Sequence, residues 1–159
     1  PSHQFVIAAA PSFDLSYFKP FTEKYPSLNI ISNRTYDLLQ ISHAALVTSG
    51  TATLETALFK VPEVVCYKAN AISYQIAKRI VDIKYISLVN LIMDQEVVTE
   101  LIQAKLNEKL LKQELGKLLS DTPERLKMIN KFEELINALG SGGASATTAE
   151  LLIEDLNHA

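Results

Sequence analysis

The feature that most constrains the fold is an alternation, through the first half of the chain, of short β-branched or aromatic runs with longer segments of helical spacing. The short runs predict strands at 4–8, 28–32, 44–48, 63–67 and 85–88, and the longer ones predict helices at 14–25, 36–41, 51–59 and 71–81. Each strand is apolar enough to be covered on both faces, as in repeated βα units. The sequence therefore predicts an α/β fold with a mostly parallel sheet flanked by helices.

The second half of the chain has a different pattern. After Glu96 the strand pattern disappears, and apolar residues recur at helical spacing, which predicts a helical C-terminal flank. Residues 140–143 read Gly-Ser-Gly-Gly and have the composition of a hinge. Behind them, Thr147 and Glu150 have the spacing of a capping box that opens a last helix through Leu156. We therefore expect one domain at 1–139, followed by a hinge and a C-terminal helix at 140–159.

Composition excludes several classes of function. With 159 residues, 48% of them hydrophobic, the chain can bury one sizeable core. A formal net charge of -3 offers no basic face for phosphate backbones, so nucleic acid is not an expected partner. The single Cys66 cannot form an intrachain disulfide, and no apolar run approaches the roughly 20 residues that span a bilayer.

The segment 44–55 carries the most information about chemistry. A buried strand runs into a turn of small residues and then directly into a helix, so free backbone N–H groups point at the carboxyl edge of the sheet. Gly50 lets a phosphate approach the backbone closely, and the hydroxyls of Ser49, Thr51 and Thr53 add donors. The alternative is that Ser49 and Thr51 only cap the helix, because Ser and Thr are ordinary N-cap residues. Composition alone leaves both interpretations open.

Glu55 follows Thr51 by four residues, so the two do not form a capping box. A carboxylate one turn into a helix, beside a bound phosphate, can accept hydrogen bonds from ribose hydroxyls. A solvated glutamate favoured by the helix dipole is an equally good interpretation.

A second cluster of polar residues follows the predicted strand at 85–88. Asn90 lies just past the carboxyl end of that strand, where open α/β sheets bind ligands, although an isolated asparagine is more typical of a turn. Glu96 and Glu100 are one helical turn apart, which usually indicates a solvated acidic face. A carboxylate pair for glycoside hydrolysis is the weaker alternative, because the sequence does not fix the gap between the two groups.

Other catalytic and cofactor patterns are missing from the sequence. No nucleophile elbow, Walker motif or dinucleotide fingerprint occurs, and the three histidines and one cysteine do not have metal-ligand spacing. We therefore expect no metal site and no cofactor.

Several segments together resemble the lipid-A-disaccharide synthase family. The resemblance rests on the order and spacing of 49–55, 61–68, 77–79 and 85–92, and it covers nearly the whole chain. It implies the C-terminal, donor-binding half of an inverting, metal-independent hexosyltransferase of the GT-B fold, which has two Rossmann-like domains. That family transfers 2,3-diacylglucosamine from UDP to 2,3-diacylglucosamine 1-phosphate, forming a β-1,6 linkage and releasing UDP in lipid A biosynthesis.

The resemblance also implies roles for particular residues. The turn from Ser49 through Gly50 and Thr51 to Thr53 would hold the diphosphate of the UDP-sugar donor, and Glu55 the ribose. Asn90 with Glu96 would form the far side of the donor site. Tyr67 and Lys68 are further candidates at the end of the next strand, where Lys68 would offset phosphate charge or, as an equal alternative, lie in solvent.

Two departures from the family pattern limit this transfer of roles. Where the family reads Ala-Gly-Arg, this chain has Met93, Asp94 and Gln95, so the assignment of Asn90 and Glu96 rests on fewer matching residues than the turn does. The family's Gly-Ser-Arg phosphate loop, expected on a βα unit before Gln4, and the acceptor domain with its candidate base are absent. We therefore expect that the first βα unit is missing, that no catalytic residue lies in this chain, and that the chain alone is inactive.

The resemblance implies a cytoplasmic protein that is peripheral on the inner face of the bacterial inner membrane, since both substrates are acylated. Lys78 and Arg79 fit contact with an anionic bilayer, although we favour a helix that packs on the sheet. Two alternatives stay open: another GT-B enzyme of UDP-sugars, such as a peptidoglycan glycosyltransferase or a UDP-N-acetylglucosamine 2-epimerase, and a non-catalytic nucleotide-binding domain. Nothing in the sequence indicates an oligomeric state.

Overall fold

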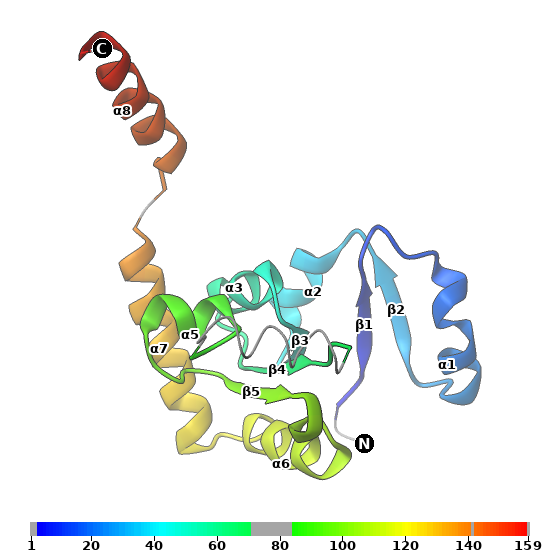
Figure 1. The fold of residues 1–159 in the computed structure, drawn as a ribbon. Coiled ribbons are helices and arrows are strands. Elements are labelled where there is room, and N and C mark those ends of the chain that lie inside the picture. The colour runs from blue at the N-terminus through cyan, green and yellow to red at the C-terminus, as the bar shows by residue number, and fades with distance from the viewer. Residues whose placement is uncertain (1–2, 71–83, 141, 159) are drawn as a thin grey trace.

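A computed structural model describes residues 3–70, 84–140 and 142–158 of the chain (Figure 1). The predicted helix at 71–81, with Lys78 and Arg79, lies outside the described residues. The apolar runs of the first half form strands joined by helices, as their periodicity predicts. The strands are β1 (Val6–Ala9), β2 (Asn29–Ser32), β3 (Ala45–Thr48) and β4 (Glu63–Tyr67), and the helices are η1 (Leu15–Phe18), α1 (Lys19–Lys24), α2 (Thr35–Ile41) and α3 (Thr51–Leu58). The predicted α/β class, with parallel strands flanked by helices, is confirmed.

The parallel strands form two sheets rather than one. In the described part of the chain, β1 pairs only with β2, while β3, β4 and β5 (Thr99–Ile102) form a second sheet in that order. His3 precedes β1 and His43 precedes β3, and their ring centroids lie 5.5 Å apart. A contact between these two rings therefore connects the chain segments that precede the two sheets.

The fifth strand lies further along the chain than predicted. β5 falls in the stretch after Glu96 that the sequence predicts to be helical, and it pairs in parallel with β4, with Thr99 opposite Val64. The β-branched run of Val97, Val98 and Thr99 favours a strand, and pairing with β4 outweighs the weak helical spacing around it.

The predicted strand at 85–88 is wrong. The chain instead bends there and starts α5 (Leu88–Met93), with Ser87 as the N-cap whose side chain accepts a hydrogen bond from the Asn90 backbone N at 3.3 Å. The backbone N–H groups of Ile86 and Ser87, which a strand would pair with a neighbour, donate to the Glu100 carboxylate. This apolar run therefore cannot join the sheet.

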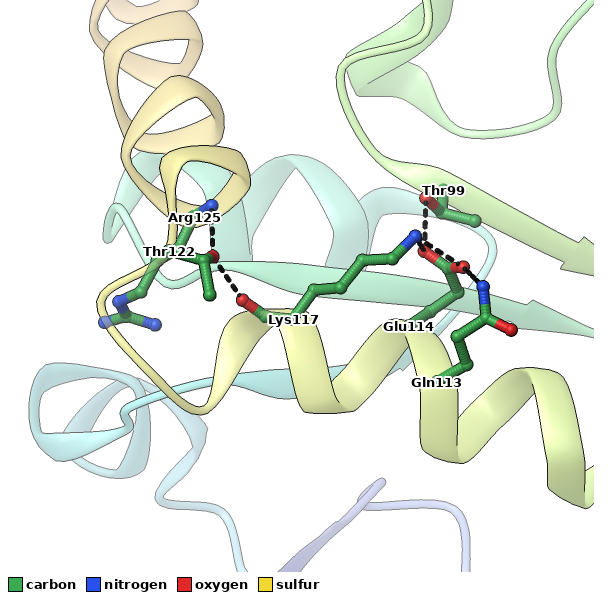
Figure 2. Close-up of polar contacts among 6 residues, drawn as sticks. All are labelled: Thr99, Gln113, Glu114, Lys117, Thr122 and Arg125. Carbon is green, nitrogen blue, oxygen red and sulfur yellow. Dashed lines mark hydrogen bonds and ion pairs between the residues drawn. The ribbon is translucent and has the colours of Figure 1, made fainter.

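Two long helices complete the second half of the structure, as predicted. α6 (Glu108–Leu118) packs against β4 and β5, and α7 (Pro123–Leu139) packs against α3, α5 and α6. Thr122 joins them: its hydroxyl accepts from the Arg125 backbone N at 3.1 Å and donates to the Lys117 carbonyl at 2.6 Å (Figure 2). The Arg125 guanidinium donates to the carbonyls of Leu118 at 2.8 Å and of His43 at 2.7 Å. The start of α7 is thereby fixed to the end of α6 and to the loop before β3.

The hydrophobic core lies between the second sheet and its helices. Its central side chains come from α3, β4, α5, β5, α6 and α7 and are at most 8% exposed: Ala57, Val64, Val65, Val89, Val98, Leu101, Leu118, Met128, Phe132 and Leu135. Because Ala57 of α3 belongs to this core, the helix that begins at the turn is anchored in the core.

The last helix, α8 (Ala144–His158), starts earlier than predicted and extends away from the rest of the chain (Figure 1). The Thr147 backbone N donates to the Gly143 carbonyl at 3.0 Å, so Thr147 lies inside the helix and is not the predicted N-cap. Gly140, with φ of 77°, ends α7 in a conformation that favours glycine. None of the described helices is both long and apolar enough to cross a membrane.

Glu63, at the start of β4, is the most unusual buried residue. Its carboxylate is completely buried and has no hydrogen-bond partner, and burial raises its pKa to about 9. The Lys117 ammonium lines the same cavity as Glu63, but it forms an ion pair with the Glu114 carboxylate at 2.7 Å (Figure 2). Because its raised pKa keeps Glu63 protonated in the folded protein, Glu63 lowers the free energy of unfolding at every pH at which the unfolded chain would ionise it.

We predict that Glu63→Gln stabilises the protein in a pH-dependent manner. The pKa of this carboxyl rises from its ordinary 4.5 to about 9 on folding, so its penalty is absent below pH 4.5, grows as the pH rises, and is complete above pH 9. The free-energy difference between variant and wild type should grow by about 1.4 kcal/mol per pH unit within that window. Urea unfolding at pH 5, 6, 7 and 8 measures it.

The matched control is Glu154→Gln, which removes an exposed carboxylate from α8. It should change the unfolding free energy by less than about 0.5 kcal/mol at every pH. A difference for Glu63→Gln that does not vary with pH would show that Glu63 is ionised in the fold.

Candidate functional site

The turn between β3 and α3 presents an uncapped helix start at the carboxyl edge of the second sheet. Gly50 is the N-cap of α3 with φ of 144°, a conformation that other residues rarely adopt. No side chain makes a cap hydrogen bond there, so the interpretation of Ser49 and Thr51 as caps is wrong. The Ser49 hydroxyl instead donates to the Ile86 carbonyl at 2.9 Å. The start of α3 keeps the character of an anion-binding group.

The three hydroxyls of the turn have different surroundings. Thr53 is fully buried, and its hydroxyl donates to the Gly50 carbonyl at 2.8 Å. The Ser49 hydroxyl donates to the Ile86 carbonyl. Thr51 and Gly50 are exposed. The groups that face solvent at this turn are therefore backbone N–H groups and the Thr51 hydroxyl, and the other two hydroxyls fix its shape.

Glu55 lies one turn further along α3, beside the loop that follows β2. The Tyr36 hydroxyl donates to its carboxylate at 3.2 Å, and this bond to the carboxylate raises the Tyr36 pKa. The Tyr36 ring stacks on Phe59, with centroids 5.5 Å apart. A shallow hollow of about 350 Å³ lies here, lined by Asn33, Arg34, Thr35, Tyr36, Asp37 and Glu55. Glu55 is thus held at the rim of an open space rather than lying free in solvent.

Tyr67 and Lys68 belong to the same edge of the sheet as the turn. β3 and β4 are parallel with Thr48 opposite Cys66, so Ser49, which follows β3, and Tyr67, which ends β4, lie at the carboxyl ends of neighbouring strands. Tyr67 is half-buried and Lys68 is exposed. The structure therefore brings these two predicted residues to the side where the α3 turn lies.

The loop before α5 is held by a single carboxylate. Glu100 Oε1 accepts from the backbone N of Ser87 at 2.9 Å, from the Ser87 hydroxyl at 2.8 Å and from Asn90 Nδ2 at 2.9 Å. The Ile86 backbone N donates to both carboxylate oxygens, at 3.1 and 3.0 Å. Glu100 is half-buried on β5, so its interpretation as part of a solvated helical face with Glu96 is wrong.

Asn90 is fully buried and its side chain is occupied within the protein. Its carbonyl oxygen accepts from the backbone N of Val97 at 2.8 Å and of Val98 at 3.0 Å. Its amide donates to the Val98 carbonyl at 2.9 Å and to Glu100. Asn90 therefore connects α5 to the start of β5 and presents no polar atom to a ligand in this structure.

Glu96 lies at the opposite edge of the sheet. It is exposed and lines a cavity of about 260 Å³ together with Glu63 and Thr99, which begin β4 and β5. The α3 turn lies where the parallel strands end, so the structure does not bring Glu96 and Ser49 together. Within the described ranges, no three His, Cys, Asp or Glu side chains are grouped so that they could hold a metal ion.

The sequence does not predict the contacts of two residues of this site: Glu100, which it offers only as a solvated carboxylate or as one of a carboxylate pair with Glu96, and Tyr36. The spacing of Glu100 from Glu96 indicates a helix and so obscures the strand on which Glu100 lies. The preceding β-branched run of Val97, Val98 and Thr99 is the signal for that strand. Tyr36 gives no local signal, because its contact with Glu55 joins residues 19 positions apart.

The parallel strands, their flanking helices and the helix start at the carboxyl edge define a Rossmann-like α/β domain. The lipid-A-disaccharide synthetase family matches residues 2–150. The chain therefore belongs to the lipid-A-disaccharide synthetase family.

Individual relatives agree with this assignment. The chain is 35% identical over 152 residues to a lipid-A-disaccharide synthase of Anaeromyxobacter dehalogenans (strain 2CP-1), a match that covers 94% of this chain and 40% of the relative. It is 32% identical over 152 residues to one of Coxiella burnetii, covering 96% and 40%, and 31% identical over 157 residues to one of Geobacter sulfurreducens, covering 98% and 41%. The chain thus spans about 40% of the length of these relatives.

We predict that Asn90→Ala destabilises the fold by about 2–4 kcal/mol, because it leaves the N–H groups of Val97 and Val98 without their acceptor in a buried place. Asn130→Ala, on an exposed position of α7, should cost less than about 0.5 kcal/mol. Urea unfolding of the two variants measures both effects. A stability equal to that of wild type in Asn90→Ala would contradict a structural role for this side chain.

Proposed function

We propose that this chain is the UDP-sugar-binding part of a lipid-A-disaccharide synthase, an inverting hexosyltransferase of the GT-B fold. The observation that carries the proposal is the uncapped start of α3 at Gly50, at the carboxyl edge of a parallel sheet. Helix starts in this position bind phosphate groups, because their N–H groups and dipole face the anion.

The turn would hold the diphosphate of the donor. The exposed backbone at Gly50 and the Thr51 hydroxyl supply donors, while Ser49 and Thr53 keep the turn in shape through their bonds to Ile86 and Gly50. In the transfer reaction, the bond from the sugar carbon to the diphosphate oxygen breaks and negative charge develops on UDP. Fixed N–H donors stabilise such a charge without reorganising, which is the role that a metal ion has in other enzymes.

Glu55 would bind the ribose. Its carboxylate lies one turn from the diphosphate turn and at the rim of the hollow that Tyr36 and Arg34 also line. Two ribose hydroxyls can donate to one carboxylate, as they do in dinucleotide-binding folds. The Tyr36 hydroxyl keeps the carboxylate in position before the nucleotide arrives.

The remaining predicted residues take different parts in the proposal. Tyr67 and Lys68 lie at the edge where the donor would sit, and the exposed Lys68 ammonium can offset phosphate charge. Asn90 would act through the loop that it holds, because its polar atoms are all bonded within the protein. Glu96 is left out of the donor site, since it lies at the other edge of the sheet.

The rest of the reaction would use parts of the protein outside this chain. The chain spans about 40% of the length of relatives named lipid-A-disaccharide synthase, which leaves room for an acceptor site and a catalytic base elsewhere. We propose transfer of 2,3-diacylglucosamine from UDP to 2,3-diacylglucosamine 1-phosphate, at the inner face of the bacterial inner membrane, where acylated substrates are held. No catalytic residue is assigned within this chain.

We predict that the chain binds UDP and that Glu55→Ala weakens binding at least about 10-fold, the effect of losing hydrogen bonds to a charged acceptor. Isothermal titration with UDP measures this. Glu154→Ala removes an exposed carboxylate from α8 and should leave the affinity unchanged. Equal affinities for Glu55→Ala and wild type would remove Glu55 from the ribose site.

We predict that the purified 159-residue chain forms no disaccharide when it is given both acylated substrates, because the acceptor contacts and the base would lie elsewhere. Mass spectrometry of the products, with a complete relative as the positive control, measures the turnover. Robust disaccharide synthesis by the chain alone would overturn the assignment of the catalytic groups to other parts of the protein.

A further inference from the structure

We propose that Glu100 is a positioning residue for the α3 turn, acting through the loop at Ile86 and Ser87. Glu100 lies on β5 and has no direct contact with the turn among the described hydrogen bonds. The connection runs from its carboxylate to the backbone of Ile86, and from the Ile86 carbonyl to the Ser49 hydroxyl. The inference rests on the proposed function only in calling this turn a nucleotide site.

The first link is a charged acceptor that several donors share. The backbone N–H groups of Ile86 and Ser87, the Ser87 hydroxyl and the Asn90 amide all donate to the Glu100 carboxylate at 2.8–3.1 Å. Hydrogen bonds to an ionised acceptor are shorter and stronger than those between neutral groups. Two consecutive backbone N–H groups bonded to one carboxylate leave the loop little freedom to rotate.

The second link transmits this position to the turn. The Ile86 N–H is held by Glu100 while the Ile86 carbonyl accepts from Ser49 at 2.9 Å, so one residue carries both bonds. Ser49 is adjacent to Gly50, whose φ of 144° sets the direction of the first N–H groups of α3. Releasing Glu100 would therefore allow the Ser49 side of the turn to move.

A neutral glutamine cannot replace this carboxylate. Both oxygens accept from the Ile86 N–H, and one of them also accepts three further bonds. In Glu100→Gln, one of the two oxygens becomes an NH₂ group, which cannot accept a hydrogen bond. Whichever way the amide is turned, this group faces the Ile86 N–H. The variant preserves size and shape while it removes the charge and part of the acceptor capacity.

The first experiment does not depend on nucleotide. In Glu100→Gln, we expect the amides of Ile86 and Ser87 to exchange hydrogen at least about 10-fold faster than in wild type. We also expect the NMR signals of Gly50 and Thr51 to shift, and we expect the same two signals to shift in Ser49→Ala. Glu108→Gln removes an exposed carboxylate on α6 that forms an ion pair with Lys112, and it should change neither set of signals.

If Glu100→Gln does not fold, Ser87→Ala replaces it. This variant removes one of the bonds to Glu100 and the helix cap, and we expect a smaller shift of the Gly50 and Thr51 signals in the same direction. Unshifted signals of Gly50 and Thr51, in a folded variant whose Ile86 and Ser87 amides exchange faster, would overturn the proposal, because the loop would then move without the turn.

The second experiment is a double-mutant cycle on UDP affinity. We expect Glu100→Gln and Ser49→Ala each to weaken UDP binding, and the double variant to bind no more weakly than the weaker single variant, because both act through the same connection. If Glu100 only stabilised the fold, the losses of UDP affinity in the two single variants would multiply in the double variant. That result would overturn the proposal. If wild type does not bind UDP while the NMR shifts occur, the positioning role stands and the proposed function fails.

Discussion

The hydrogen bonds that converge on the Glu100 carboxylate are the interaction on which the functional edge of this structure depends. A backbone segment outside helices and strands must find other partners for its N–H groups. Here the loop before α5 meets that requirement with one charged acceptor on the next strand. The same acceptor orients Asn90, which in turn holds the start of β5. Loop, helix and strand are therefore arranged together and cannot be placed independently.

The parallel direction of β3, β4 and β5 gives the two edges of their sheet different polar groups. At the carboxyl edge, the start of α3 offers N–H donors, and the exposed Lys68 adds positive charge. At the amino edge, the cavity beside the buried Glu63 is lined by side chains of both charges, among them Glu96, Glu114, Lys117 and Lys131. In the proposed function, the strand direction therefore places the donor diphosphate at the first edge, where the N–H groups at the start of α3 face the anion.

The sequence predicts the local elements well and their long-range pairing poorly. Four of the five strands and the helix that follows β3 were predicted from periodicity and from the Ser-Gly-Thr turn, because those signals are contained in neighbouring residues. The error at 85–88 came from an apolar run whose backbone donors are taken by a residue 13 positions or more away. The burial of Asn90 and the contact of Tyr36 with Glu55 also join distant positions, which no local pattern contains.

The division of the strands into two sheets has a consequence for how the molecule opens. Among the residues that the structure describes, the side chains of the central core come from β4, β5, the residue before β5 and four helices, and none comes from β1 or β2. Large apolar side chains on the β1–β2 side, such as Phe5, Phe13 and Tyr17, are about half exposed or more. Segments with little buried apolar surface open at a lower free energy than the global unfolding. The β1–β2 unit should therefore detach as a separate cooperative unit, a foldon, while the α3 turn stays folded with the core.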